Sequence, residues 1–408
     1  MTEVKRLLGQ MYVEGSEMFR KHLNKTLNKW RDEKVKFGIA GQTSTGKSSF
    51  INMLTGSTKS NEKRAKTSGY GNTTKLTTEY TYTRQRNVSF VDCPGFGTPS
   101  FKPQSYFEEM GVNRFDYIFI FFNVISIIDI QFAQALAKKD MKFCFVRTKL
   151  DIDIESAEHD SEENISPDSI ASNLRETTEK SIQKEQFPKP SVFVISNRVN
   201  YSQFGHLQDL LSHIEQVLQK TKYDAFIYEI AAYTREVIKK KYDFLHERIN
   251  GISFAAVVDE VEVATDFVFE NIEKYKKERK SLNIINWLAK EIMLYIETFE
   301  LSKKSSLTLI REEYVRQKLK FAKLLTTDVE KNVTIFIKRK LELKIKKTVK
   351  SKELHNKSTG GWIKDDKDVQ FLQKEYPHLI PSINILSEVL DGLQHDALVI
   401  FDEFSKGQ

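Results

Sequence analysis

The chain has 408 residues, of which 40% are hydrophobic and 29% charged, and its formal net charge is +7. The hydrophobic fraction excludes an intrinsically disordered chain, and the length suffices for two or three domains. The two cysteines, Cys93 and Cys144, are too few for a disulfide-stapled scaffold.

The positive charge is concentrated in one segment. Residues 303–353 hold 16 Lys and Arg against 6 Asp and Glu, so the rest of the chain is slightly acidic. Such a segment could contact anionic lipid, nucleic acid or an acidic partner, or it could be a solvated helix face. It carries no zinc-ligand spacing, RNA-binding signature or cluster of stacking aromatics, so we expect no nucleic-acid partner.

The first half of the chain predicts an α/β domain after leading helices. Apolar residues within 3–33 recur at helical spacing, which predicts one or two helices. Residues 35–40 then match a short strand, followed by a glycine-containing loop and a helix over 47–54. Further strand patterns, separated by helical stretches, lie at 76–83, 87–92, 117–122, 142–146 and 192–195. This alternation predicts a mostly parallel sheet with helices on both faces.

The second half predicts helices. An amphipathic helix over 205–220 closes the α/β unit, and helical candidates follow at 224–248, 255–280, 282–300, 305–325 and 382–405. Residues 331–347 alternate with period two, which favours a strand, whereas their context favours a helix. We expect the acidic segment 151–163 to be a solvated loop.

Three segments follow from these patterns. They are an N-terminal helical segment at 1–34, an α/β domain at 35–220 and a helical domain at 221–408. We expect the N- and C-terminal segments to build one all-helical domain.

The strongest motif lies between the first strand and its helix. Residues 41–48 fit Gly-x-x-x-x-Gly-Lys-Ser/Thr, the phosphate-binding loop (P-loop). Its glycines let successive backbone N–H groups turn onto phosphate oxygens at a helix N-terminus. Lys47 should reach the β- and γ-phosphates and assist catalysis, and the Ser48 hydroxyl should ligate Mg²⁺. The other expected nucleotide contacts are Gly41, Thr43, Ser44, Thr45, Gly46 and Ser49.

Two later segments should complete the phosphate side. Residues 91–95 end a strand with Asp-x-x-Gly, the pattern of GTPases, so Asp92 should hold the magnesium shell through water and the Gly95 N–H should sense the γ-phosphate. Thr73 and Thr74 lie where a switch segment supplies a Thr to Mg²⁺ and the γ-phosphate. Thr74 is our candidate for that catalytic and metal-binding role; Thr73 and an ordinary polar loop are the alternatives.

Residues after two further strands favour guanine over adenine. Residues 148–151 form a variant of Asn-Lys-x-Asp, in which the carboxylate of Asp151 would accept hydrogen bonds from guanine N1 and N2, a donor pair that adenine lacks. Thr148 opens the motif, and the stem of Lys149 would lie along the purine face. Ser196 and Asn197 follow the next strand and can supply a backbone donor to guanine O6. In this order and spacing, the motifs predict GTP or GDP with Mg²⁺.

These motifs, together with Asp-Ile-Gln-Phe-Ala at 129–133, resemble the immunity-related (interferon-inducible) GTPase family over about residues 35–220. The resemblance implies a dynamin-like GTPase that dimerises or oligomerises through its nucleotide face and acts in cell-autonomous immunity. It also implies a cytoplasmic protein, peripheral on intracellular membranes, with related GTPases as possible partners. Lys47 matches the Lys form of the family.

Two P-loop residues depart from the family. Gln42 stands where the family commonly has Glu, and Ser44 stands where it has Gly. The family's Glu is associated with nucleotide contact across the dimer and with catalysis. Gln42 keeps the hydrogen bonding without the charge, which makes it a candidate catalytic residue.

Turnover is expected to depend on a second protomer. Phe96 follows Gly95, where small signalling GTPases have the Gln that orients water. Gln42, or an arginine such as Arg64 or Arg84, could complete the site from a partner. The alternative is a nucleotide-gated regulator that binds GTP, hardly hydrolyses it and acts on related GTPases or another partner.

Two apolar sets at helical spacing could contact a membrane or pack in a core, and packing is the favoured reading. They are Ile284, Ile285, Leu288, Ile292 and Ile296, and, in the basic segment, Ile310, Tyr314, Leu319, Ala322 and Leu325.

Overall fold

The computed structural model describes most of the chain, in two compact units. The described residues are 6–7, 10, 13–57, 65, 78–81, 87–95, 103–160, 165–187, 190–265, 273–326, 328–350 and 378–406. The α/β unit comprises Trp30–Ile238 with Ser405–Gln408, and the helical unit comprises Met1–Lys29 with Lys239–Phe404.

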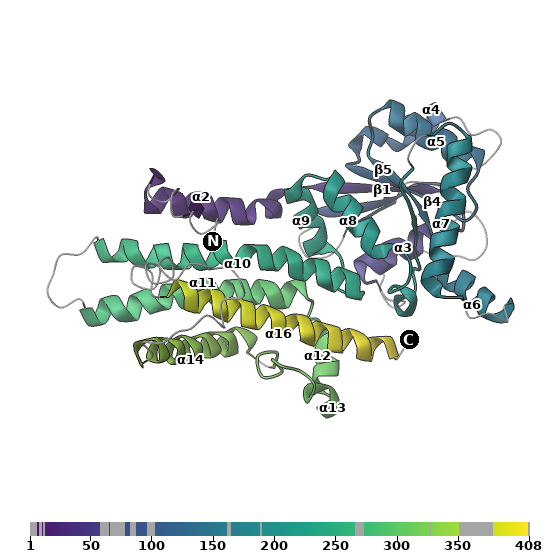
Figure 1. Ribbon diagram of the computed structural model, residues 1–408. Helices are drawn as coiled ribbons and strands as arrows, with labels where there is room; N and C mark the ends of the chain where they lie inside the picture. The colour runs from purple at the N-terminus through teal and green to yellow at the C-terminus, as the bar shows by residue number, and fades with distance from the viewer. Residues whose placement is uncertain are drawn as a thin grey trace. The chain divides into compact units, whose positions relative to one another are not determined.

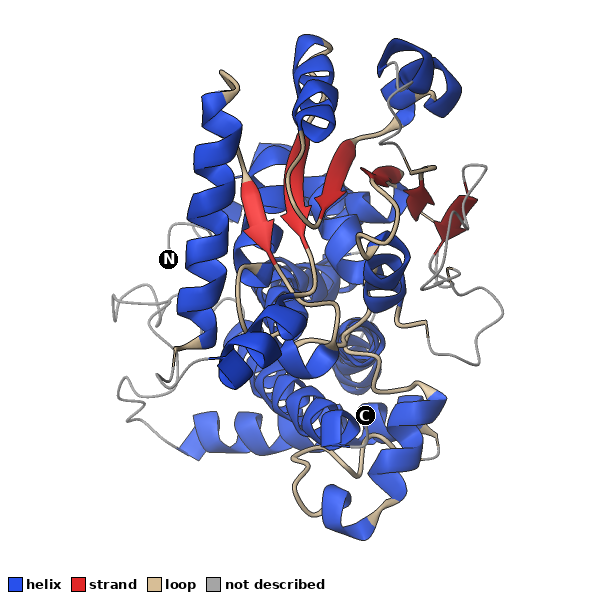
Figure 2. Cartoon of the chain, turned by 90° about the vertical axis from the view of Figure 1, so that its right-hand side faces the viewer, coloured by secondary structure: helices blue, strands red, loops and turns tan. Residues whose placement is uncertain are grey.

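Within the described residues, six strands form one sheet in the α/β unit (Figures 1 and 2). They are β1 Val35–Gly41, β2 Thr78–Thr81, β3 Val88–Asp92, β4 Tyr117–Phe122, β5 Phe143–Arg147 and β6 Val192–Val194. Their order is β2-β3-β1-β4-β5-β6, and only β2 runs antiparallel to its neighbour. The predicted mostly parallel sheet is confirmed.

Helices cover both faces of this sheet (Figure 1). Phe37 of β1 packs against Phe119 of β4 and Phe226 of a helix on one face, with ring centroids 5.6 and 4.9 Å apart. The alternate residues of β4, such as Ile120, pack on the other face with Phe132. Every residue of β4 is buried, as a central strand covered on both sides requires. The helices of this unit are α3 Lys47–Thr55, α4 Pro103–Met110, α5 Ile127–Lys138, α6 Leu150–Asp160, α7 Pro167–Lys184, α8 Leu207–Val217 and α9 Lys220–Glu229.

The strand order reverses at β1. From β1 the chain continues to β2 and β3 on one side, and it then crosses to β4 on the other side of β1. Ligands of open α/β sheets bind outside the carboxyl ends of the strands at such a switch point. The loops after β1, β3, β4, β5 and β6 all meet at this edge because these strands are parallel.

The helical unit joins the N-terminal helix to the C-terminal helices. Phe19 of α2 stacks edge-to-face on Phe254 of α10, with ring centroids 5.7 Å apart. The predicted all-helical domain built from both ends of the chain is therefore confirmed. Its helices are α2 Ser16–Asn28, α10 Arg235–Thr265, α11 Glu273–Thr298, α12 Lys304–Arg311, α13 Glu313–Arg316, α14 Val329–Lys350 and α16 Leu379–Lys406.

Several helix predictions were wrong at their boundaries. The predicted helices at 224–248, 255–280 and 282–300 are instead α9, α10 and α11, with different ends. The predicted helix 305–325 is broken after α12, and only the four residues of α13 follow before a run of turns. Asp396 of α16 explains these turns, because its carboxylate accepts the backbone N–H groups of Lys320 and Phe321 at 2.7 and 2.8 Å.

We had expected the acidic segment 151–163 to be a loop, and this prediction was wrong. Residues 150–160 form α6, because Leu150 and Ile154 are buried together one turn apart. Residues 161–163 lie outside the described residues.

Residues 331–347 are helical, so the period-two pattern was misleading. Val333, Ile337 and Leu341 are buried at a spacing of four within α14, while Ile335 and Leu343 are exposed. The helical alternative is confirmed.

The two apolar sets that could contact a membrane lie mostly in the core. Ile284, Ile292 and Ile296 are fully buried, as is Leu325, and only Tyr314 is well exposed. Neither set forms an apolar surface stripe, and the packing alternative holds. No helix among the described residues combines the length and apolarity needed to cross a bilayer.

Candidate functional site

The P-loop has the backbone that its glycines allow. Gly41 ends β1 with φ 138°, and Gly46 precedes α3 with φ 87°. A Cβ on Gly41 would lie 2.1 Å from the carbonyl oxygen of Phe121, so only glycine fits there. No side chain caps α3, which leaves the N–H groups of its first turn directed at the loop, where an anion can bind. Thr43 and Ser44 are exposed in the loop, and Ser49 lies in the first turn of α3.

Lys47 folds back across the loop. Its Nζ donates to the carbonyl oxygens of Gly41 and Gln42 at 3.1 and 2.7 Å. Burial lowers the pKa of Lys47, while the nearby Asp92 carboxylate acts in the opposite direction. The ammonium is therefore held at the P-loop by oxygens that a phosphate can replace.

Ser48 and Asp92 meet beside the loop. The Ser48 hydroxyl donates to Asp92 Oδ2 at 2.9 Å. A hydroxyl and a carboxylate oxygen next to a P-loop are the donors that hold Mg²⁺ in nucleotide sites, so these residues fit the metal. Gly95 also lies against the loop, since a Cβ there would be 2.8 Å from Thr43 Oγ1. The structure thus brings the predicted Asp92–Gly95 segment to the P-loop.

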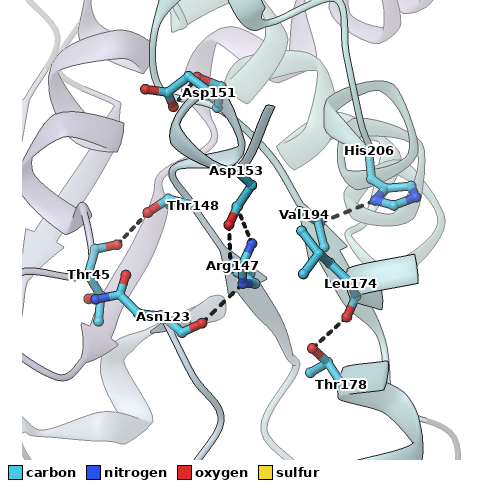
Figure 3. A network of polar contacts seen from close by, with 11 residues as sticks. Thr45, Asn123, Arg147, Thr148, Asp151, Asp153, Leu174, Thr178, Val194 and His206 are labelled. Carbon is cyan, nitrogen blue, oxygen red and sulfur yellow. Dashed lines mark hydrogen bonds and ion pairs between the residues drawn. The ribbon is translucent and has the colours of Figure 1, made fainter. Parts of the chain in front are cut away.

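Three loops, after β4, β5 and β6, are hydrogen-bonded to three consecutive P-loop carbonyls, those of residues 44–46. We call this side of the P-loop, which carries the predicted base-recognition residues, the base side. Each tie comes from the end of a different strand: Asn123 follows β4, Thr148 follows β5 and Asn197 follows β6. Thr148 Oγ1 donates to Thr45 O at 2.7 Å (Figure 3). Asn123 Nδ2 donates to Ser44 O at 3.5 Å, and Asn197 Nδ2 donates to Gly46 O at 3.0 Å. With the loop carbonyls engaged on this side, its N–H groups are left for phosphate.

Asp151 lies in the first turn of α6 and is 5% exposed. Its Oδ1 accepts the Ser196 hydroxyl at 2.8 Å, and its Oδ2 pairs with Arg198 Nε at 2.9 Å. A carboxylate has about four acceptor positions, so two remain for a base. Lys149, two residues before it, has a left-handed φ of 67°.

Gln42 is engaged within its own chain. Its Nε2 donates to Ser126 Oγ and to Asp129 Oδ2, both at 3.0 Å. Asp129 and Ser126 also form the capping box of α5, and burial raises the pKa of Asp129. The P-loop is thereby fastened to the start of α5, and the catalytic role of Gln42 stays a prediction.

Four polar residues of this edge were not among the predicted site residues. They are Asn123, Arg147, Asp153 and Arg198: Asn123 bonds to Ser44, Arg147 bonds to Asn123 and Asp153, and Arg198 pairs with Asp151. Arg147 directly precedes Thr148, and a charge at the end of an apolar strand is the signal that could have found it. Thr73, Thr74, Phe96, Arg64 and Arg84 lie outside the described residues.

A P-loop after β1 at the sheet's switch point, with the Asp151 carboxylate after β5 at the same edge, defines a P-loop protein of the GTPase type. Comparison with known families is more specific. The family model for interferon-inducible GTPase (IIGP) matches residues 13–286, well over half of the chain. The chain belongs to this family.

Individual relatives agree with that assignment. T-cell-specific guanine nucleotide triphosphate-binding protein 2 of Mus musculus is 31% identical over 232 residues, which are 56% of this chain and 54% of that protein. Interferon-inducible GTPase 1 of Mus musculus is 31% identical over 249 residues, 59% of this chain and 58% of that protein. The chain therefore matches little more than half the length of these relatives.

Solved structures are similar at a lower level. Toc33 from Arabidopsis thaliana in complex with GDP and Mg²⁺ is 18% identical, with 43% of this chain and 76% of that chain covered and a TM-score of 0.32. A TM-score this low bears on neither fold nor function.

Proposed function

We propose that the chain binds GTP with Mg²⁺ and hydrolyses it to GDP. One observation carries the proposal: the P-loop and the base-side carboxylate lie at the same sheet edge, joined by the bond from Thr148 to Thr45. A ligand bridging them needs a purine with two adjacent donors at one end and phosphates at the other. Guanosine triphosphate has both.

Each part of the ligand has a partner of matching chemistry. The two remaining acceptor positions of Asp151 suit guanine N1–H and the 2-amino group. The N–H groups of the P-loop, the start of α3 and the Lys47 ammonium suit the phosphates. Ser48 and Asp92 would hold Mg²⁺, which when bound supplies charge neutralisation at the β- and γ-phosphates.

Hydrolysis is proposed to be slow in single molecules and faster when a second copy completes the site. Gln42 is held by Ser126 and Asp129 of its own chain, so it is not poised to orient water. Val124 and Ile127, on either side of that contact, are 81% and 61% exposed. Apolar side chains exposed beside the P-loop suit self-association at this face.

Membership of the family supports a role in cell-autonomous immunity, with related GTPases as further possible partners. We propose a cytoplasmic protein that is peripheral on intracellular membranes. The exposed face of α14 favours this location, because Lys331, Lys338 and Arg339 lie on it with Ile335 and Leu343 and outnumber the exposed Glu342 there. Sedimentation with anionic but not neutral liposomes is expected; equal recovery from both would count against it.

The alternative function is a nucleotide-gated regulator that hardly hydrolyses GTP, and the engaged Gln42 keeps it open. GTP turnover by the purified chain, measured over a wide range of protein concentration with Lys47→Ala as control, separates the two. Specific activity that climbs with concentration and vanishes in the variant supports an assembly-activated GTPase. Flat, near-zero turnover with tight GTP binding supports the regulator.

A further inference from the structure

Arg147 is a partly buried residue beside Thr148 that bonds to the loop after β4 and to the first turn of α6. It ends β5, one residue before Thr148, and its side chain is 16% exposed. Its Nε donates to the carbonyl oxygen of Asn123 at 3.0 Å, and both terminal nitrogens donate to the carboxylate of Asp153, the second at 2.9 Å (Figure 3). These bonds are directed at protein groups, so Arg147 is not itself aimed at a ligand.

The partners of Arg147 flank the base-recognition residues. Asp153 lies in the first turn of α6, two residues after Asp151. Asn123 follows β4 and its amide donates to the P-loop at Ser44. One guanidinium therefore fixes the loop after the neighbouring strand and the helix turn that carries Asp151.

The segment between Arg147 and Asp153 contains a strained residue and has to be held in place. Lys149 has φ 67°, a left-handed conformation that costs free energy for any residue except glycine. On its far side, the Leu150 N–H donates to Ile195 O at 3.2 Å. The Arg147 fork spans the whole segment, because it joins the end of β5 to Asp153.

We propose that Arg147 is a positioning residue for guanine recognition, which holds Asp151 so that both carboxylate oxygens meet the base. The inference rests on the proposed function, because it takes a guanine nucleotide as the ligand. Arginine suits the task because its planar fork binds a carboxylate through two parallel bonds, which the single ammonium of lysine cannot do.

Inosine diphosphate (IDP) tests the geometry directly. Hypoxanthine keeps N1–H but lacks the 2-amino group, so it makes one of the two bonds to Asp151. The ratio of GDP to IDP affinity therefore reports whether both oxygens are in place. A hydrogen bond to a charged group is worth roughly tenfold or more in affinity, and that advantage should disappear when Asp151 is loosened.

The experiment measures GDP and IDP binding calorimetrically for the full chain and for Arg147→Met, Arg147→Lys and Asp153→Asn. Arg175→Met is the matched control, since Arg175 of α7 pairs with Glu179 at 3.0 Å and with Asp209 at 3.6 Å, and neither partner belongs to a base-recognition motif. We expect the GDP-to-IDP ratio to fall about tenfold in Arg147→Met and Asp153→Asn, less in Arg147→Lys, and to be unchanged in Arg175→Met. The double variant Arg147→Met/Asp153→Asn should be no worse than either single one.

A fall of both affinities by the same factor would overturn the inference, since that is the result of a merely structural role. An unchanged ratio in every variant would overturn it too. Should Arg147→Met not fold, Arg147→Lys and Asp153→Asn carry the same test. Wild-type chain that binds neither nucleotide contradicts the proposed function, and the inference falls with it; wild-type preference for GDP with an unchanged ratio in the variants contradicts the inference alone.

Discussion

His206 shows how a single residue connects the sheet to its surroundings. Its Nδ1 accepts the backbone N–H of Val194 at 3.3 Å (Figure 3), and the backbone N–H of His206 donates to Val194 O at 2.9 Å. An accepting Nδ1 requires that nitrogen to be unprotonated. Burial, followed by the nearby Arg175, lowers the pKa of His206.

Stability should consequently fall on mild acidification. Above the ordinary pKa of about 6.5, His206 is neutral in both folded and unfolded chains, so it does not make the free energy of unfolding depend on pH. As the pH drops below that value, the unfolded chain takes up a proton that the folded chain resists, so the free energy of unfolding decreases until the lowered pKa is reached.

His206→Asn should weaken this pH dependence, because the amide oxygen can keep the bond from Val194 and does not titrate. Urea unfolding of wild type and variant at pH 7.5 and 5.5 measures it. His213, whose pKa burial also lowers, should leave part of the slope in the variant. An identical pH dependence in both proteins would show that His206 does not cause the loss of stability at low pH.

At the scale of elements, the pairing of β1 with β4 explains why position 41 requires glycine. β1 and β4 pair in parallel with Gly41 opposite Phe121, and this register brings the Phe121 carbonyl within 2.1 Å of a Cβ at Gly41. Neither backbone can move without breaking the ladder that positions the site.

Gly41→Ala should therefore cost about 3 kcal/mol or more of unfolding free energy. Gly111→Ala is the matched control: φ is also positive there at 55°, but the nearest atom, Arg114 Cδ, is 3.7 Å away. The control should lose only the backbone strain, about 1 kcal/mol. Denaturant unfolding compares the two, and equal losses would mean that the close approach is not what selects glycine.

Local patterns predicted most of the α/β unit. The strand and P-loop motifs are contiguous in sequence, so the sheet and the loop could be read directly. α6 was missed because its many acidic residues masked Leu150 and Ile154, which are buried one turn apart. The turns after α13 depend on Asp396, which lies more than seventy residues away, and no local pattern encodes that bond.

The candidate site follows the same division. Lys47, Ser48 and Asp151 belong to short motifs and were named from the sequence. The bonds of Arg147 and Asn123 join the ends of different strands, so only the assembled sheet brings them together.

At the scale of the whole molecule, the two ends of the chain fold into one helical unit around a buried ion pair. Arg248 of α10 pairs with Glu291 of α11 through bonds of 2.8 and 3.0 Å, and both side chains are almost fully buried. Arg248 also donates to the carbonyl of Leu27 in α2. One guanidinium thus joins three helices that are far apart in sequence.

Glu291→Leu should destabilise the chain by about 3–5 kcal/mol, because it leaves the Arg248 charge buried without its carboxylate. The double variant Arg248→Met/Glu291→Leu should recover much of that loss, since both charges are then removed. Thermal unfolding of the three proteins checks this. A double variant less stable than Glu291→Leu would show that the bond to Leu27, rather than the charge balance, dominates.

Reading of guanine by Asp151 is the central claim, and it is tested most directly by Asp151→Asn with a change of nucleotide. Xanthine has a carbonyl where guanine has its 2-amino group, so an amide that accepts from N1–H and donates to O2 suits it. We expect GDP affinity to fall roughly a hundredfold and xanthosine diphosphate to become the preferred ligand.

Glu155→Gln is the control, because Glu155 also pairs with Arg198 but belongs to no base-recognition motif. It should keep the wild-type preference for GDP. An Asp151→Asn variant that still prefers GDP, or that loses GDP without gaining xanthosine diphosphate, would contradict the account.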